Sequence, residues 1–280
     1  MSYSMNQFYE SIGISKQAVH QYDRRQKLFD QRLMELMSEA EDIRRDHPGC
    51  GVEKMYYTLK PDFIGRDRFV ETFMQLGYRL KRKKNCRRTT IAGKIYYPNK
   101  IKGLEISAPS MVWQSDITYY RVGDNFYYAV FIIDVYTKKI VGYEVSDHMR
   151  GTANLKALRM ALKDNKSPKI HHSDRGSQYT YRTYTDLLQS HSTTISMALS
   201  AQDNAYAERI NRTIKEEYLD HWKPKTFSQL KRQVKKAVDN YNTKRSHNHL
   251  EKRNPQEFIY YWSTLTPEKR PVITIINNEN

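Results

Sequence analysis

Residues 112–219 alternate between short segments with the composition of β-strands and amphipathic segments with the period of α-helices. Three segments rich in Val, Ile, Tyr and Thr come first, with turn signals around Gly123 and Thr137, and they predict an antiparallel meander. Helices and single strands then follow in turn. The predicted strands span residues 112–120, 126–136, 139–146, 169–173 and 194–198, and the predicted helices span 152–163, 181–190 and about 203–219.

This order of elements matches the ribonuclease-H-like α/β fold, in which a mixed sheet carries helices on both faces. A chain of 280 residues is long enough for roughly two to four compact units. We therefore predict a ribonuclease-H-like core with smaller regions on either side. The predicted regions are residues 1–46 (a helix-turn-helix and a connecting helix), 47–105 (a second helix-turn-helix and a basic linker), 106–222 (the core) and 223–280 (a basic extension).

Residues 6–25 have the pattern of a small helix-turn-helix, with a first helix at 6–12, Gly13 in the turn and Ser15 as the cap of the second helix. Two candidate DNA contacts open that second helix: Lys16 and Gln17. From Phe29 to Ile43, apolar residues recur with 4-3-4-3 spacing, which predicts one helical stripe that packs within the chain.

A second helix-turn-helix is predicted beyond Pro48 and Gly49, with helices at 52–59 and 66–76. Two arginines at the start of its second helix, Arg66 and Arg68, are candidates for contacts with phosphates or base edges. A dense basic run follows, and we interpret it as a linker that tracks DNA. It consists of Arg79, Lys81, Arg82, Lys83, Lys84, Arg87 and Arg88.

The formal net charge of +16 is unevenly distributed. Residues 1–110 hold 21 basic and 13 acidic side chains, residues 222–280 hold 12 and 5, and the residues between them hold 14 and 13. Two basic regions therefore flank a nearly neutral core. Basic surfaces bind nucleic acid by releasing counterions from phosphate, so this distribution favours a protein that acts on nucleic acid.

Three acidic residues stand in distinctive local sequences: Asp116 in W-Q-S-D-I-T-Y, Asp174 in H-H-S-D-R-G-S-Q-Y and Glu208 in D-N-A-Y-A-E-R. Asp116 lies within the first predicted strand and Asp174 follows the fourth, so the two converge if these strands are neighbours, as the fold requires. The 33 residues between Asp174 and Glu208 hold a helix, a strand and a loop, which is enough to bring the last helix back across the aspartates.

Carboxylates this close repel one another unless cations lie between them. Mg²⁺ prefers carboxylate oxygens, and two such ions can activate the attacking oxygen and stabilise the leaving oxygen during displacement at phosphorus. We therefore predict that Asp116, Asp174 and Glu208 are catalytic ligands of two Mg²⁺ ions, which Mn²⁺ can replace. This chemistry needs no covalent protein intermediate.

Other polar residues surround these acids. Arg212 and Lys215 share a helix face with Glu208, where they either grip phosphate or form salt bridges within the helix. Two further residues are candidates for supporting the site: His172 and Gln178. By contrast, Asp134 and Asp203 are predicted to cap a turn and the last helix rather than to bind metal.

Several protein classes are disfavoured. No apolar run approaches the ~18 residues that cross a membrane, and the first residues do not resemble a secretory signal. Two cysteines, Cys50 and Cys86, are too few for a disulfide framework, which indicates the reducing cytoplasm. They form no C-x₂-C pair, and His20 and His47 lack the spacing of a zinc module, so no zinc site is expected.

Taken together, these motifs resemble the DDE transposases of bacterial insertion sequences, in particular the second-frame (OrfB-type) group whose core is similar to retroviral integrase. The resemblance covers nearly the whole chain. Its segments are Y-E-S-I-G-I-S-K from Tyr9, D-H-P-G-C-G from Asp46, G-R-D-R-F from Gly65, W-Q-S-D-I-T from Trp113, I-D-V-Y-T-K-K-I-V-G from Ile133, H-H-S-D-R-G-S-Q-Y from His171, D-N-A-Y-A-E from Asp203, Y-N-T-K-R-S-H-N-H-L from Tyr241 and P-Q-E-F from Pro255.

The resemblance implies that Asp116, Asp174 and Glu208 are the catalytic metal ligands and that Lys215 is the basic residue one heptad after the glutamate. It also implies nicking of double-stranded DNA at the ends of the element, and then attack by the freed 3′-hydroxyl on another phosphodiester. A homo-oligomer, expected as a dimer, would bring two ends together.

The chain departs from the family pattern in two places. The family more often has 35 residues where this chain has 33, and the leucine zipper of the upstream reading frame is missing. A fused or separate zipper partner is therefore expected.

Three other functions are compatible with parts of the sequence. A nuclease of the same fold is disfavoured by the two helix-turn-helix patterns, because recognition of specific ends suits a transposase better. A DNA-binding regulator is disfavoured by the three intact acids. A tyrosine recombinase would form a covalent phosphotyrosine, which a protein–DNA adduct on a denaturing gel would reveal.

Overall fold

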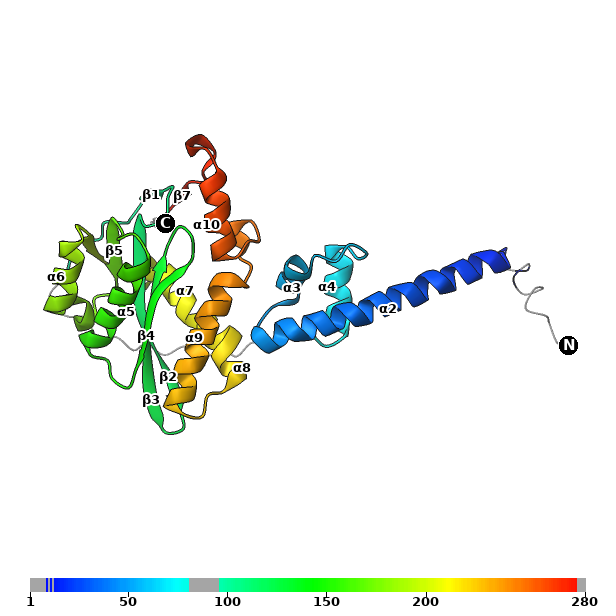
Figure 1. The fold of residues 1–280 in the computed structure, drawn as a ribbon, viewed down its shortest axis with the longest axis horizontal. Coiled ribbons are helices and arrows are strands. Elements are labelled where there is room, and N and C mark those ends of the chain that lie inside the picture. Colours follow the sequence, from blue (N-terminus) through cyan, green and yellow to red (C-terminus); the bar gives the residue numbers. More distant parts are fainter. Residues whose placement is uncertain (1–8, 10, 12, 81–95, 276–280) are drawn as a thin grey trace. The chain divides into compact units, whose positions relative to one another are not determined.

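The computed structural model describes residues 9, 11, 13–80 and 96–275. The chain forms two compact units, of which one consists of Met1–Asp46 with Gly51–Arg79 and the other of His47–Cys50 with Leu80–Asn280. The described elements of the first unit are helical, and the second unit contains the sheets (Figure 1). Among the described residues, no helix is both long and apolar enough to cross a bilayer.

The first unit begins with one long helix, α2 (Lys16–Asp46). Ser15 caps this helix, because its Oγ accepts a hydrogen bond from the Ala18 N–H at 3.1 Å. We predicted one helix after Ser15 and another from Phe29, and that separation was wrong. The sequence between residues 16 and 46 contains no glycine or proline, so nothing interrupts the hydrogen-bond ladder. Of the helix predicted at 6–12, all but residues 9 and 11 lie outside the described residues.

An apolar core holds α2 against α3 (Val52–Leu59) and α4 (Arg66–Gln75). Phe69 and Phe73 of α4 stack with their ring centroids 4.1 Å apart, and Gly77 follows the helix with a φ of +87°. The buried side chains of this core are Leu36, Ala40, Val52, Met55, Ile64, Phe69 and Phe73. The bounds predicted for the two helices of the second helix-turn-helix and the inward packing of the α2 stripe are therefore confirmed.

Five strands form the mixed sheet of the second unit in the order β4-β3-β2-β5-β6. The first three pair antiparallel, whereas β5 runs parallel to β2 and β6 runs parallel to β5. The strands are β2 (Val112–Val122), β3 (Asn125–Asp134), β4 (Ile140–Ser146), β5 (Ile170–Ser173) and β6 (Thr194–Met197). This is the predicted ribonuclease-H-like sheet, and every strand lies within two residues of its predicted bounds.

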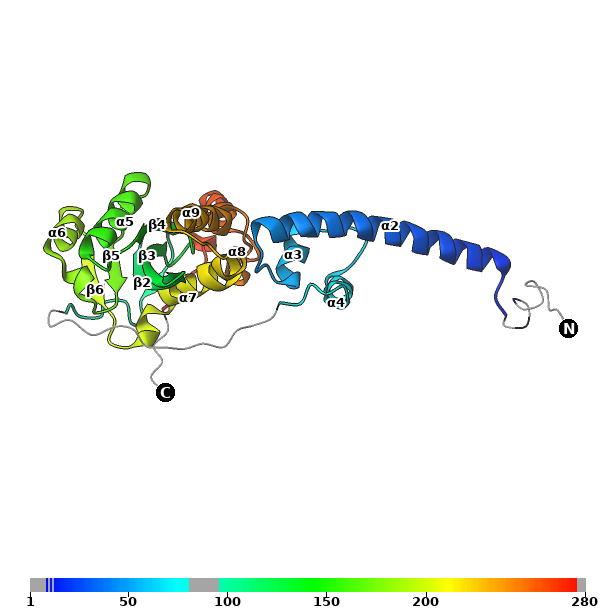
Figure 2. The same ribbon diagram turned by 90° about the horizontal axis from the view of Figure 1, so that it is seen from below.

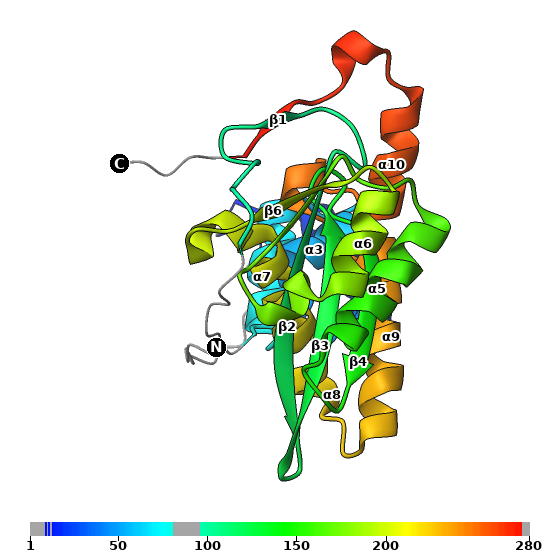
Figure 3. The same cartoon turned by 90° about the vertical axis from the view of Figure 1, so that its left-hand side faces the viewer.

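Helices cover both faces of this sheet (Figures 2 and 3). They are α5 (Gly151–Asp164) and α6 (Arg182–Ser190) on one face, and α7 (Ala205–Ile214) and α9 (Phe227–Thr243) on the other. The strand period explains this arrangement, because Val130 and Ile132 of β3 pack with α5 and α6, whereas Phe131 and Ile133 pack with α7 and α9. Gly142 of β4 allows the close approach of α5, since a Cβ there would lie 2.3 Å from a backbone oxygen of that helix.

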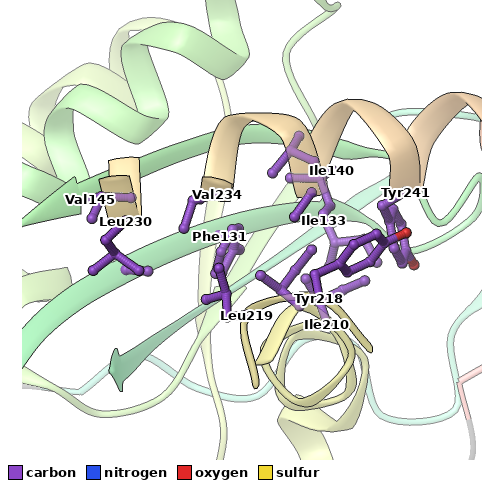
Figure 4. Packing of buried hydrophobic residues seen from close by; sticks show 14 of the residues in the cluster. Phe131, Ile133, Ile140, Val145, Ile210, Tyr218, Leu219, Leu230, Val234 and Tyr241 are labelled. Carbon is purple, nitrogen blue, oxygen red and sulfur yellow. The ribbon is translucent and has the colours of Figure 1, made fainter. Parts of the chain in front are cut away.

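The helix that carries Glu208 is not regular. After a 3₁₀ turn at 201–204, α7 passes into a π-helical segment, Lys215–Leu219, and the helix ends with α8 (Asp220–Trp222). The prediction of one α-helix from about residue 203 to 219 was wrong in this detail. A π-helical turn holds one more residue than an α-helical turn. Figure 4 shows that both Tyr218 and Leu219 point into the core between α7, α9 and β3.

The region after residue 222 is not separate from the core. Its helix α9 covers the sheet, and α10 (Pro255–Thr264) follows. The short strand β7 (Ile273–Thr274) then pairs antiparallel with β1 (Glu105–Ile106). Phe258 of α10 is buried in a cluster with Tyr136 and Leu250. The residues predicted as a basic extension therefore belong to the same compact unit as the sheet.

Candidate active site

Asp116 and Asp174 lie side by side where β2 and β5 stop pairing. The last parallel pair in register is Ser115 with Ser173, and each aspartate is the next residue of its chain segment. Neighbouring strands run about 4.8 Å apart, so the two side chains start from adjacent backbone positions. The predicted convergence of the two aspartates is confirmed.

The Asp116 side chain faces α7. Burial raises the pKa of its carboxyl to about 7, with additional repulsion from Asp174 and Glu208. Two hydrogen bonds oppose this shift by stabilising the charged form, one from the Ile117 N–H at 2.9 Å and one from Asn211 Nδ2 at 2.7 Å. The surroundings of Asp116 therefore neutralise its charge incompletely.

The other two acids are perturbed in the same direction. Burial raises the pKa of Asp174, whose Oδ1 accepts a hydrogen bond from the Gly176 N–H at 3.0 Å. A Cβ at Gly176 would lie 2.7 Å from Gln178 Oε1 and 3.0 Å from Asp174 Oδ1, so Gln178 lies close to this loop. Burial also raises the pKa of Glu208, which Arg212 lowers and Asp174 raises. Asp174 thus contributes to the raised pKa of both Asp116 and Glu208.

The three carboxylates do not form a closed metal cluster. Within the described parts of the chain, no three acidic, histidine or cysteine side chains lie close enough together to hold one ion. Their chemistry nevertheless fits a hard divalent cation, because carboxylate oxygens are the ligands that Mg²⁺ prefers. The raised pKa of Asp116, caused first by burial and then by repulsion from the other acids, fits as well, since a cation bound there would favour the charged carboxylate.

Two amide side chains fix the start of α7 to β2. Gln114 Oε1 accepts hydrogen bonds from the backbone N–H groups of residues 206 and 207 at 3.2 and 3.3 Å. Asn204 Nδ2 donates to a backbone oxygen of β2 at 3.0 Å. Both anchors lie next to Asp116 on one side and within one turn of Glu208 on the other. They therefore hold the helical acid over the strand that carries the first aspartate.

Asn211 is a site residue that sequence analysis missed. Its side chain is buried and donates to Asp116 Oδ2 from the facing helix. Its own Oδ1 is buried without a hydrogen-bond partner among the described atoms. The available signal was its spacing, because a residue three positions after Glu208 lies on the same helix face. The contact itself depends on how α7 packs on β2.

His172, a predicted supporting residue, lies two register rows before the aspartates, between Gln114 and Ser196. Its Nδ1 forms a hydrogen bond with Ser196 Oγ at 2.8 Å. Burial lowers the pKa of His172 to about 4, so the ring is neutral at physiological pH. This hydrogen bond is thus with the neighbouring strand, and a role in catalysis stays a prediction.

The predicted capping role of Asp134 is confirmed. Its Oδ1 accepts hydrogen bonds from the Thr137 N–H at 2.8 Å and hydroxyl at 3.0 Å, and its Oδ2 accepts one from the Ser110 N–H at 2.6 Å. Asp203 also caps a helical turn, but this turn is the 3₁₀ turn before α7 rather than α7 itself. Its Oδ2 accepts hydrogen bonds from the N–H groups of residues 199 and 200.

The candidate DNA-binding residues occur in both units. Lys215 Nζ lies 4.9 Å from the ring centroid of Tyr119, and burial lowers the pKa of this lysine. In the first unit, Arg68 Cζ lies 4.5 Å from the ring centroid of Phe29. The exposed candidates are Lys16, Gln17, Arg66, Arg68, Arg79 and Arg212. Six others lie outside the described residues: Lys81, Arg82, Lys83, Lys84, Arg87 and Arg88. All of these contacts remain predictions.

Residues 107–201 and 192–255 match two models of the integrase core domain. The chain is 33% identical over 204 residues to the insertion element IS600 uncharacterized 31 kDa protein of Shigella sonnei, which covers 70% of this chain and 75% of that protein. It is 32% identical over 170 residues to the transposase for insertion sequence element IS904 of Lactococcus lactis, covering 59% and 67%. A putative transposase for IS986/IS6110 of Mycobacterium tuberculosis is 28% identical over 264 residues, covering 87% and 93%.

Among solved structures, a chain of the simian T-cell lymphotropic virus intasome in complex with PP2A regulatory subunit B56 gamma is similar in fold. It superimposes with a TM-score of 0.51 and 13% identity, and the match covers 80% of this chain and 74% of that chain.

Proposed function

Since this chain belongs to the insertion-sequence transposases that carry an integrase core domain, and so cleaves and transfers DNA strands, we propose that Asp116, Asp174 and Glu208 are its catalytic residues. The observation that supports this assignment most is the register of β2 and β5, by which the two aspartates lie next to each other below α7. The raised pKa of Asp116 adds a perturbed carboxylate in that position, a common property of catalytic sites.

The three carboxylates would hold divalent cations, with two Mg²⁺ ions as the expected complement and Mn²⁺ as a substitute. Bound ions supply an activated attacking oxygen and stabilise the oxygen that leaves phosphorus. The chain's own residues would position these ligands: Asn211 donates to the Asp116 carboxylate, and Gln114 holds the start of α7, the helix that carries Glu208, on β2. Arg212 and Lys215, which follow Glu208 on the helix, would neutralise phosphates of the bound DNA.

Cleavage and joining are two rounds of the same displacement. Water first attacks the phosphodiester at the end of the element, and the 3′-oxygen leaves with a proton as a free hydroxyl. That hydroxyl then attacks a phosphodiester of the target, and a 3′-oxygen of the target leaves. Each round exchanges one P–O bond for another, so neither a redox partner nor a covalent protein intermediate is required.

We further propose that the first unit recognises the ends of the element. The second helix of the helix-turn-helix in α3 and α4 begins with the exposed Arg66 and Arg68, and α2 begins with the exposed Lys16 and Gln17. Arg79 and the basic residues up to Arg88 would add contacts with phosphates. A dimer that brings two ends together, and a zipper partner from an upstream frame, complete the proposal.

Asp116→Asn in the full chain tests the catalytic assignment. The substrate is a duplex that carries the terminal sequence of the element with a labelled 3′ end, in the presence of Mg²⁺. We expect the rates of cleavage and joining to fall by about 100-fold or more, which is the size of the loss when an enzyme loses one group that stabilises its transition state. Asp164→Asn, at the exposed end of α5, is the matched control. Undiminished cleavage by Asp116→Asn would refute the site, and cleavage without joining by the wild type would favour a nuclease.

A further inference from the structure

Four residues of the second unit come from the middle of the first. His47–Cys50 belong to the second unit, although the chain on both sides of them, up to Asp46 and from Gly51, belongs to the first. This 47–50 segment lies against the π-helical segment Lys215–Leu219. In the chain, the 47–50 segment therefore joins α2 to α3, while it packs on the core.

The backbone of the 47–50 segment lies in direct contact with the π-helical segment. The Gly49 N–H donates a hydrogen bond to the backbone oxygen of Glu217 at 2.7 Å. A Cβ at Gly49 would lie 2.2 Å from the Cα of Glu217 and 2.7 Å from its Cβ, which no side chain tolerates. Glycine is required here for space, because every larger residue would push the two segments apart.

Side chains complete this contact around the Glu217 carboxylate. His47 Nε2 donates to Glu217 Oε2 at 2.7 Å, and Arg245 donates through Nε to Oε2 and through Nη2 to Oε1, both also at 2.7 Å. The His47 ring stacks on Tyr218 with centroids 4.5 Å apart and planes 9° apart. Burial would lower the pKa of Arg245, but its hydrogen bonds to Glu217 raise it above the ordinary value. A bidentate pair in such a sheltered place has a well-defined geometry.

The contacted segment is part of the helix that carries the candidate site. The π-helical segment begins at Lys215, seven residues after Glu208. Tyr218, on which His47 stacks, packs in the same core as Ile210 and Ile214 of α7. Short π-helical turns are rare inside α-helices and occur often at functional sites. The contact of the 47–50 segment with residues 217 and 218 therefore also restrains the position of α7.

We propose that the 47–50 segment couples the binding of an element end by the first unit to the alignment of α7 in the active site. His47, Gly49 and Glu217 act as positioning residues in this coupling, and none of them touches the reacting atoms. When the segment contacts the π-helical turn, Glu208 and Lys215 are held in the positions that catalysis requires. When this contact is lost, the first unit still binds an element end, but binding no longer aligns α7. This inference rests on the proposed function.

The test uses the full chain with two substitutions, made separately, that each weaken the contact between the 47–50 segment and the π-helical segment. Gly49→Ala places a methyl group against Glu217, and His47→Ala removes the stacking ring and one hydrogen bond without adding an atom to the core. Gly51→Ala is the matched control, since a Cβ at Gly51 meets no atom within 4 Å. The probes are a duplex with the terminal sequence of the element and a scrambled duplex of equal length. For each variant, Kd, single-turnover cleavage of bound DNA in Mg²⁺ and the melting temperature are measured.

We expect Kd for the end duplex to stay within about twofold of the wild-type value in both variants, because the contact between the 47–50 segment and the π-helical segment does not involve DNA. Cleavage of the bound end should fall about 10- to 100-fold, as expected when catalytic groups are misplaced by about 1 Å. Residual nicking of the scrambled duplex should not change, so that the ratio of the two rates falls toward one. Gly51→Ala should behave as the wild type.

Equal losses of cleavage on both duplexes would overturn the proposal, because the segment would then only support the fold. A weaker Kd with unchanged cleavage of the bound end would overturn it too. If Gly49→Ala does not fold, His47→Ala alone decides between these outcomes. A wild-type protein that cleaves neither duplex in Mg²⁺ would instead refute the proposed function.

Discussion

In the absence of divalent cations, we expect Asp116→Asn to stabilise the protein, and to do so more at pH 8 than at pH 5. The folded state raises the pKa of the Asp116 carboxyl from 3.8 to about 7. A carboxyl with a raised pKa costs stability when it is charged, so this cost grows as pH rises from the ordinary value and is complete above the folded value. Asparagine has the same shape and keeps one oxygen that can accept the hydrogen bond from Asn211, whereas its amide nitrogen cannot accept the one from the Ile117 N–H, which offsets part of the gain.

The size of the effect follows from the same value. Between pH 5 and pH 7 the cost of the charge grows by at most about 2.7 kcal/mol, since each pH unit corresponds to 1.36 kcal/mol. Asp116 is only partly shielded from water, which reduces this figure to about 2 kcal/mol. For a unit of this size, that corresponds to a difference in Tm of about 4–8 °C between wild type and variant at pH 8 relative to pH 5.

Thermal unfolding in EDTA at pH 5, 6, 7 and 8 measures this difference directly. Addition of Mg²⁺ at pH 8 should stabilise the wild type and leave Asp116→Asn nearly unchanged, because only the charged carboxylate binds the cation strongly. Asp164→Asn, on the exposed end of α5, should show neither effect. A variant whose advantage is the same at every pH, or a Mg²⁺ effect of equal size in both proteins, would show that the Asp116 charge does not cost stability in this way.

Three further substitutions test other parts of the structure. Asn211→Ala removes a hydrogen bond to a charged group, worth about 1.5–3 kcal/mol, and so raises the pKa of Asp116 further. The acidic limb of the pH profile of cleavage should therefore move to higher pH. An unchanged limb would contradict the role of Asn211 in stabilising the Asp116 carboxylate. Gly142→Ala places a Cβ 2.3 Å from the backbone oxygen of Ala157, so the free energy of unfolding in urea should fall by at least about 1–3 kcal/mol, whereas unchanged stability would mean that α5 and β4 separate easily. Lys215→Ala should weaken binding of end and scrambled duplexes by the same factor and reduce the salt slope by about 1; a slope equal to that of the wild type would remove Lys215 from the phosphate contacts.

The core was predictable because its signals are local. Strand period, turn residues and helical stripes predicted all five strands of the sheet and the helices between them, and the strand order of the fold then brought Asp116 next to Asp174. Predictions failed where a local signal was silent. Nothing in the residues between Ser15 and Phe29 separates one helix from two, and no local pattern indicates the π-helical turn at Lys215.

The region after residue 222 shows a different limit. Its charge suggested a basic extension, yet its apolar side chains complete the core of the second unit. Net charge describes the exposed side chains of a helix such as α9, whereas its position is decided by the face that it buries, with Val234 and Tyr241 against the sheet (Figure 4).

Local sequence patterns were enough to predict the strands and the flanking helices, because backbone preferences and the strand period act between residues that are near one another in the chain. The strand order of the fold then predicted the pair of aspartates. Three properties could be found only from the packed structure: the hydrogen bond from Asn211 to Asp116, the contact between Gly49 and Glu217, and the raised pKa of Asp116. These properties depend on distances between residues far apart in the chain and on how much water the packing excludes. Both are set only when the helices pack on the sheet.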